Sequence, residues 1–337
     1  MAAQPSEAAG SAEGEAPSDP AAGHPLLPVL AMAEDAYARL GSEVRDYTCR
    51  IIRRERLGGK LGQYEFMRAK IRHAWPPPAQ QQKPAAEQQG PAERREPAEQ
   101  QEPAERQATV EQHASSDSVD AVNANNGDAP SSDAPEAEAT GDQPSTAATA
   151  FSVYLRFEQP KAVRGREVLF RQGHDAGKML VRRGGTRLAY VTTYLAPDSR
   201  LALQESRYPV TDIGFRRLVA RLIDVIREDL QHGECRVRFY RGAKIGDRRC
   251  TRVLVEHPVR REHFRYHRAI IFIDQDRQLP LGYASYTWPE EPGGKPVLVE
   301  EYLYTDVRLN VGLTDGDFDR DNPDYGFLKR KAVEAAR

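Results

Sequence analysis

The sequence has few cysteines and no long apolar run. Its 337 residues include three cysteines, Cys49, Cys235 and Cys250. Their spacing matches no metal-ligand pattern and each lies in a strand-like stretch, so we expect free buried thiols, with one disulfide as the alternative for an exported protein. No run reaches the roughly 18 apolar residues that a membrane-spanning helix requires, which excludes such helices.

The sequence also lacks the common nucleophile and nucleotide motifs. Gly-x-Ser-x-Gly, the P-loop and Gly-x-Gly-x-x-Gly are all absent, so we expect neither a cofactor nor an enzyme. His263 and His267 are four residues apart, but in a strand this places their Cβ atoms about 13 Å apart, too far for one zinc ion. We interpret them as polar residues on a strand face, with a metal site or a hydrolase centre as the alternatives.

An acidic stretch near the C-terminus, residues 315–321, resembles the start of a calcium loop. A calcium loop of the EF-hand type needs glycine at its sixth position and glutamate at its twelfth, and here those positions hold Arg320 and Gly326. A solvated acidic turn is the better interpretation, and no metal site is expected.

The formal net charge of −2 is an average over segments of opposite sign. Residues 25–74 and 151–337 contain 44 Lys or Arg and 32 Asp or Glu, whereas residues 1–24 and 75–150 contain 4 basic and 18 acidic residues. The sequence therefore predicts a basic folded body interrupted by acidic segments.

Composition also sets the expected domain boundaries. Residues 1–24 form an acidic tail rich in Ala, Pro, Glu, Ser and Gly, and 76–150 form an insert rich in Pro, Ala, Glu and Gln. Neither can bury enough apolar surface to offset the entropy of ordering, so both are predicted to be disordered. Strand patterns border the insert, which predicts one discontinuous β-rich domain over 25–75 and 151–328, and a short tail over 329–337.

Periodicity predicts two helices and about eleven strands. Apolar residues at steps of three and four indicate a helix over 25–40 and a second one from Phe215 to Leu230, capped by Thr211 or Asp212. The alternating stretches are 48–57, 61–72, 151–157, 168–171, 178–182, 187–194, 235–241, 249–255, 263–274, 281–288 and 297–307. We expect an α+β, mainly antiparallel fold, with a large curved sheet or incomplete β-barrel wrapping both helices.

Two long motifs, GREVLF at 165–170 and LNVGLTDGDFD at 309–319, resemble a bacterial protein family of unknown function, number 1571 among such domains. Shorter matches are DYTC at 46–49, SVYL at 152–155 and EEYLYT at 300–305. The resemblance covers nearly all of 25–328 except the insert and supplies no catalytic residues. It implies export to the periplasm or cell envelope, whereas the N-terminus lacks the basic start of a signal peptide, so a cytoplasmic location is the alternative.

The order of helices and hairpins is also similar to the periplasmic lipoprotein-carrier fold, an incomplete β-barrel that holds acyl chains in an apolar concavity. This resemblance implies a carrier of a lipid or lipoprotein acyl chain, with an anionic membrane surface as a possible partner and no nucleic acid. The expected ligand-binding residues are Met67, Val153, Leu155, Val237, Phe239, Val253, Ile270 and Phe272. Arg53, Arg68, Arg236 and Arg238 would form a basic rim. The ordinary alternative is that the apolar set packs directly on the helices.

A second hypothesis is a polyanion or nucleic-acid binder. Basic residues on the paired strands 48–57 and 61–72 would form a stripe that tracks phosphates, modulated by the acidic insert. Glu55 and Glu65 interrupt that stripe, and no motif of a named nucleic-acid fold is present. The oligomeric state does not follow from the sequence.

Overall fold

The computed structural model describes residues 23–75, 148–185 and 191–327. These residues form one antiparallel sheet of twelve strands, accompanied by a few helices. The predicted α+β, mainly antiparallel fold is therefore confirmed. The count exceeds the expected eleven because Lys60–Leu61 forms a separate short strand, β2, beside the first long one.

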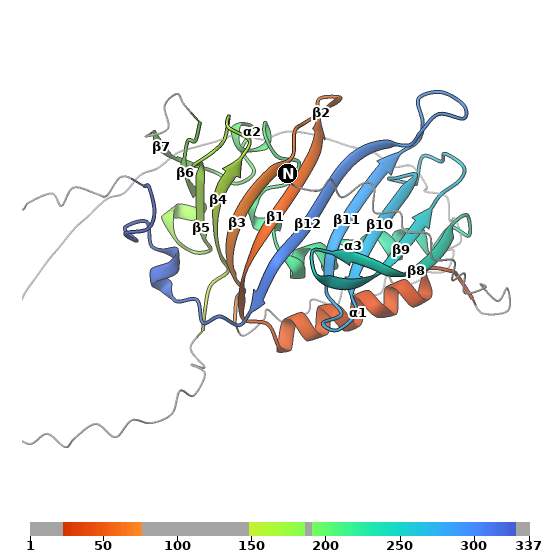
Figure 1. Cartoon of the computed structure of the whole chain (residues 1–337), viewed down its shortest axis with the longest axis horizontal. Helices are drawn as coiled ribbons and strands as arrows, with labels where there is room; N and C mark the ends of the chain where they lie inside the picture. The colour runs from red at the N-terminus through yellow and green to blue at the C-terminus, as the bar shows by residue number, and fades with distance from the viewer. Residues whose placement is uncertain (1–22, 76–147, 186–190, 328–337) are drawn as a thin grey trace, which may run out of the picture. The chain divides into compact units, whose positions relative to one another are not determined.

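The first half of the sheet runs from its edge strand to β1 in the order β7-β6-β5-β4-β3-β1, and β2 pairs with β1 (Figure 1). These strands are β1 (Asp46–Leu57), β3 (Glu65–Arg72), β4 (Ser152–Gln159), β5 (Glu167–Arg171), β6 (Met179–Arg182) and β7 (Thr192–Leu195). The predicted strand 187–194 starts at residues outside the described ranges.

The second half continues from β1 in the order β12-β11-β10-β9-β8. These strands are β8 (Arg236–Ile245), β9 (Arg248–Glu256), β10 (Arg268–Asp274), β11 (Pro280–Thr287) and β12 (Val297–Leu309). The last strand of the chain thus lies beside the first and joins two series of hairpins. The predicted strand 263–274 begins only at Arg268, because residues 261–267 form turns that pack Phe264 and Tyr266 inward.

Strands β3 and β4 pair from Phe66–Gln159 to Arg72–Ser152, although 79 residues separate their ends. Beyond this ladder, Trp75 and Thr149 exchange backbone hydrogen bonds of 2.9 and 2.8 Å. The predicted insert 76–150 lies outside the described residues except for its last three. The predicted tail 1–24 also lies outside them except for its last two residues, and so does all of 329–337.

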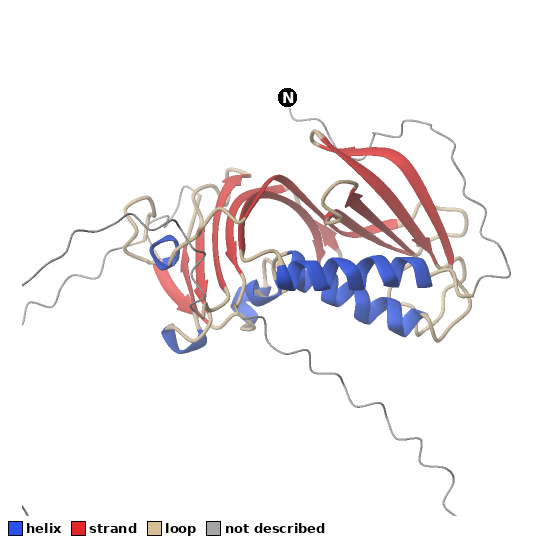
Figure 2. Cartoon of the chain, turned by 90° about the horizontal axis from the view of Figure 1, so that it is seen from below, coloured by secondary structure: helices blue, strands red, loops and turns tan. Residues whose placement is uncertain are grey.

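The two long helices, α1 (Leu27–Ser42) and α3 (Phe215–Asp229), pack against each other on the concave side of the arched sheet (Figure 2). Their buried residues join those of β1, β3 and β4 in the main core, which includes Leu40, Val219 and Met67. The expected caps for α3 are wrong, because Thr211 and Asp212 belong to the preceding turn η3 (Val210–Asp212). The N-cap is Gly214.

The opposite, convex face of β4–β6 carries its own apolar cluster. Tyr154, Leu169 and Leu180 pack there against the C-terminal segment, which contains the 3-10 turn η4 (Asp315–Phe318) and Tyr325. The rings of Tyr154 and Tyr325 stack with centroids 3.7 Å apart. The C-terminal segment therefore packs on the convex face of the sheet, whereas the helices pack on the concave face.

Within the described ranges, no helix combines the length and apolarity needed to cross a bilayer. All three cysteines are buried and free, as expected.

Candidate functional site

A cavity of about 750 Å³ lies between the concave face of the sheet and the segment that runs from β7 through α3. Its walls include apolar side chains of the sheet (Ile51, Met67, Leu155, Val168 and Ile271) and of α3 (Leu218, Leu222 and Val225). Pockets of about 300 to 1,000 Å³ with mostly apolar walls are typical of small-molecule sites. The cavity has the size and lining to hold an apolar molecule.

Helix α3 supplies two apolar surfaces. Phe215, Val219, Ile223 and Ile226 are buried in the protein core. Leu218, Leu222 and Val225 recur at steps of four and three, remain half-buried and line the cavity. The stripe expected from the sequence therefore has a buried half and a second half that packs at the edge of the core and lines the cavity.

The loop between α2 (Arg200–Leu203) and α3 forms one wall, and polar contacts attach it to the sheet. Arg53 on β1 donates from Nη1 to Ser206 Oγ at 2.8 Å and from Nη2 to the carbonyl of Glu205 at 3.1 Å. Its Nε also donates to Glu65 at 2.6 Å. Burial lowers the pKa of Arg53, but the charges of Glu55 and Glu65 outweigh burial and raise it. Arg53 is therefore charged, and its hydrogen bonds to Ser206 and Glu205 attach the loop to β1.

Two buried carboxylates complete this attachment. Glu55 accepts hydrogen bonds from the Tyr302 hydroxyl and from the backbone nitrogen of Arg207, the latter at 3.2 Å. Glu300 accepts from the Tyr208 hydroxyl at 2.7 Å, and burial together with the charge of Glu300 raises the pKa of Tyr208 to about 12. We call these contacts the loop clasp. The hydrogen bonds of Glu55 and Glu300 attach the loop to the sheet, and this loop is one wall of the cavity.

The structure divides the predicted ligand-binding residues among four places, three of which are on the concave face. Met67 and Leu155 line the cavity, whereas Val153 is fully buried beside them in the main core. Val253 is fully buried in a second cluster on the same face, and Val237 and Phe239 pack against that cluster.

The expectation that Ile270 and Phe272 also face the concavity is wrong. Their neighbours Ala269 and Ile271 line the cavity, so these two residues lie on the convex face, with Ile270 paired to Leu254.

The predicted basic rim does not form one surface. Arg53 points into the cavity wall, as described above. Arg68 is on the convex face, where its Nε donates to Glu158 at 2.6 Å. Arg236 and Arg238 occur on the edge strand β8 at register positions beside Glu256 and Leu254, which also belong to the convex face. Strand alternation places them away from the cavity.

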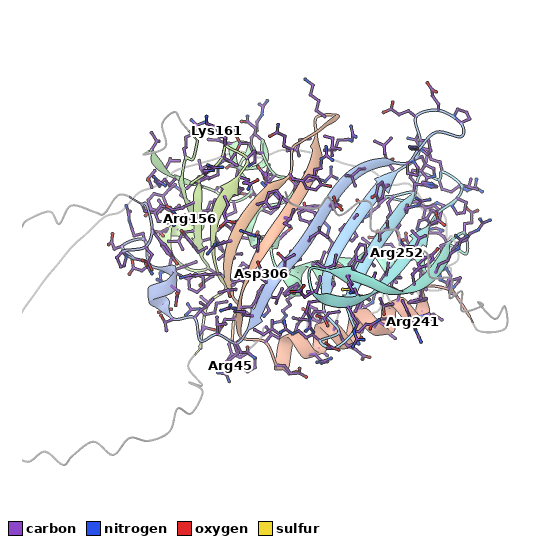
Figure 3. All side chains as sticks on the ribbon, viewed as in Figure 1. Arg45, Arg156, Lys161, Arg241, Arg252 and Asp306 are labelled. Carbon is purple, nitrogen blue, oxygen red and sulfur yellow. The ribbon has the colours of Figure 1, made fainter. Side chains whose placement is uncertain are left out.

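Most basic residues of the stripe on β1 and β3 make ion pairs. Glu158 contacts both Arg50 and Arg68 at 2.6 Å, and Lys70 contacts Asp317 at 2.8 Å. Arg156, labelled on β4 in Figure 3, is exposed and makes no ion pair with a described residue. Glu158 and Asp317 therefore neutralise three basic side chains, Arg50, Arg68 and Lys70, on this part of the sheet.

The predicted histidine and acidic motifs form packing contacts. The ring of His263 stacks on His232 with centroids 3.7 Å apart, and His267 lies in another contact, with Nδ1 2.9 Å from the carbonyl of His257. Within the described ranges, no group of three or more His, Cys, Asp or Glu side chains could hold a metal ion.

The acidic turn is not simply solvated. Asp315 lies 2.6 Å from Arg72 and Asp317 lies 2.8 Å from Lys70, so both carboxylates hold the C-terminal segment on the sheet. The hydrogen bond from Arg72 lowers the pKa of Asp315, against the opposing effect of burial. For Asp317, burial is the largest single effect and raises the pKa, but the hydrogen bonds from Lys70 and Thr314, together with the charge of Lys70, outweigh it and lower the pKa.

Sequence reasoning missed two arginines of α3 that line the cavity, Arg217 and Arg221. They are one turn apart and adjoin Leu218 and Leu222, so a basic pair runs beside the second apolar stripe. The sequence feature that could have indicated them is the width of the apolar stripe of α3, which is too broad for one contact face and includes the adjoining Leu218 and Leu222.

Comparison with known proteins gives one sequence match and several distant structural ones. A family model described as "Protein of unknown function (DUF1571)" matches residues 44–327. No curated protein matches the chain in sequence.

Similar solved structures share about a tenth of their residues with this chain. A DUF1329 family protein from Desulfovibrio piger is 12% identical, with 88% of this chain and 98% of that chain covered and a TM-score of 0.33. The Pseudomonas aeruginosa MucA/MucB complex is 11% identical, with coverages of 86% and 60% and a TM-score of 0.36. A LolA superfamily protein from Nitrosomonas europaea is 9% identical, with coverages of 86% and 96% and a TM-score of 0.25. Likenesses this distant do not assign a function to the chain.

Proposed function

We propose that this chain, which belongs to the DUF1571 family of proteins of unknown function, is a non-enzymatic binding or carrier protein for a lipid or lipoprotein acyl chain. The observation that carries the proposal is the cavity of about 750 Å³ on the concave side of the sheet, lined largely by aliphatic side chains. Burying an acyl chain is favourable by about 0.8 kcal/mol for each methylene group removed from water.

The helix that borders the cavity supports this proposal. Leu218, Leu222 and Val225 are half-buried, although they adjoin fully buried residues on the same helix. An apolar ligand would cover them. The family resemblance adds the expectation of a periplasmic or cell-envelope location.

The polyanion hypothesis has less support. Most of the basic side chains that would track phosphates are in ion pairs with carboxylates, as with Arg50 and Arg68, which both contact Glu158. A polyanion would have to displace those carboxylates, so we do not propose this function.

The test combines native mass spectrometry with an uncharged fluorescent probe, 1-N-phenylnaphthylamine. Protein purified from a bacterial envelope should carry a co-purifying lipid, and stripped protein should enhance the fluorescence of the probe. Leu222→Trp fills the cavity and should abolish the enhancement. Val259→Trp adds the same side chain at a half-exposed position that does not line the cavity, and should leave the enhancement intact. Absence of co-purifying lipid, together with equal probe signals from the two variants, would overturn the proposal.

A further inference from the structure

Helix α3 places two arginines at the rim of the cavity. Arg217 and Arg221 are exposed, line the cavity and form no ion pair with a described residue. The guanidinium of Arg221 lies 3.8 Å from the centroid of the Tyr208 ring. Stacking on an aromatic face orients a guanidinium and leaves its N–H donors available for another acceptor.

Two other arginines of the cavity wall, Arg53 and Arg166, are already in ion pairs. Arg53 contacts Glu65 at 2.6 Å, and Arg166 forms an ion pair with Glu205. The buried carboxylates of the loop clasp likewise have partners, since Glu55 accepts from Tyr302 and Glu300 from Tyr208. The charged groups of the loop clasp therefore have partners within the protein, whereas Arg217 and Arg221 at the rim form no ion pair with a described residue.

The charges left at the rim have an excess of positive sign. Arg183 is a third exposed arginine of the lining without an ion pair to a described residue. Asp212 and Asp224 are the acidic groups of the lining that make no ion pair with a described residue, and both are exposed. Three cations facing two anions attract a negative group more strongly than a neutral one.

Apolar residues of the cavity lining are next to these cations along α3. Leu218 and Leu222 follow Arg217 and Arg221 by one residue each, about 100° further around the helix, and all four residues line the cavity. A molecule that contacted both would place a negative head at the rim and an apolar chain in the cavity.

We infer that the cavity takes a single-chain amphiphile with an anionic head, either a carboxylate or a phosphate, and that Arg217 and Arg221 hold that head. This inference rests on the proposed function and adds the chemical class of the ligand. Two neighbouring arginines suit either head group, because guanidinium groups form charge-assisted hydrogen bonds with both carboxylate and phosphate oxygens.

The experiment compares four probes with the same oleyl or oleoyl chain: oleate, oleoyl lysophosphatidate, zwitterionic oleoyl lysophosphatidylcholine and uncharged oleyl alcohol. Each competes with 1-N-phenylnaphthylamine for the full-length protein. The two anionic probes should bind at least tenfold more tightly than the alcohol, and their advantage should shrink as salt is raised, because exposed charges are screened. The ratio of oleate to lysophosphatidate affinity distinguishes a carboxylate source from a phosphate source.

The variant Arg217→Gln/Arg221→Gln should lose about tenfold in affinity for the anionic probes and keep its affinity for the alcohol. Arg227→Gln/Arg216→Gln is the matched control, because it removes two charges from α3 at positions outside the cavity lining. Circular dichroism and the melting temperature of each variant show that it has folded.

Two outcomes would overturn the inference while leaving the proposed function in place. One is equal affinity of the wild-type protein for charged and uncharged probes. The other is an equal loss in the cavity variant and its control. Failure of all four probes to displace 1-N-phenylnaphthylamine, or failure of that dye to bind, would overturn the proposed function as well.

Discussion

The hydroxyl of Tyr47 on β1 accepts a hydrogen bond from the backbone nitrogen of Phe215, the first residue of α3, at 2.9 Å. Their rings also stack, with centroids 4.8 Å apart. Gly214 permits this approach, because its φ is +103° and a Cβ there would lie 2.6 Å from the hydroxyl oxygen. The start of the cavity-lining helix is thus fixed to the middle of the sheet.

The first prediction concerns this contact. Tyr47→Phe removes the acceptor and leaves a buried N–H without a partner, so the free energy of unfolding should fall by about 1 to 3 kcal/mol. Urea titration measures the change. Tyr37→Phe is the control, since Tyr37 is only half-buried. Equal stability of the two variants would contradict a role for the Tyr47 hydroxyl in holding α3.

The second prediction concerns the loop clasp. Tyr302→Phe removes one of the hydrogen bonds to Glu55, whose other oxygen accepts from the backbone nitrogen of Arg207. Hydrogen exchange of the 204–209 peptide should become about tenfold faster, because local opening costs less free energy. Tyr286→Phe on β11 serves as the control. Unchanged exchange of this peptide in Tyr302→Phe would show that the clasp does not restrain the loop.

The third prediction concerns thiol reactivity. Burial raises the pKa of Cys235 and of Cys250 to about 11, and it raises that of Cys49 further. The thiolate is the reactive form, so at about pH 8 only ~0.1% of Cys235 would be reactive even with full access. Native protein should react with iodoacetamide far more slowly than protein in guanidinium chloride, where all three thiols should react. Rapid alkylation of the native form would contradict their burial.

The fourth prediction concerns pH. His73 is 4% exposed and its Nδ1 lies 3.0 Å from the carbonyl oxygen of Val44. Burial lowers its pKa from 6.5 to about 4. Between these values the unfolded chain takes up a proton that the folded chain does not, so stability contributed by neutral His73 is complete above about pH 6.5 and falls as the pH drops towards 4, by up to about 3 kcal/mol.

His73→Gln should therefore flatten the dependence of the unfolding free energy on pH between about 4.5 and 7. The carboxylates contribute their own dependence to both proteins, so the slope difference isolates the histidine. His174→Gln, at an exposed histidine, should keep the wild-type slope. Parallel curves for wild type and His73→Gln would show that this residue titrates alike in both states.

Much of the fold follows from local patterns in the sequence. Alternation located the strands, as at 297–307 within β12, and the spacing of apolar residues located α3. The cap of α3 was mispredicted because Asp212 is a good capping residue by type, whereas Gly214 is selected by the close approach of Tyr47. That approach is tertiary and leaves no local pattern.

The candidate site was only partly predictable, because the face of a residue depends on strand register. Met67 and Leu155 were assigned to the cavity, but Ile270 and Phe272 were placed one position away from the residues that face it. A shift of one residue reverses the face of a side chain. The loop clasp joins residues as far apart as Glu55 and Tyr302, so periodicity along the chain could not reveal it.

The bridge between Trp75 and Thr149 has a consequence for dissecting the protein. The chain leaves and rejoins the sheet at two residues whose backbones are hydrogen-bonded to each other, and the adjoining β3–β4 ladder holds the same two segments together. Separate polypeptides 1–75 and 148–337 should therefore reassemble by fragment complementation, and a chain with its termini moved to this point should be a workable circular permutant.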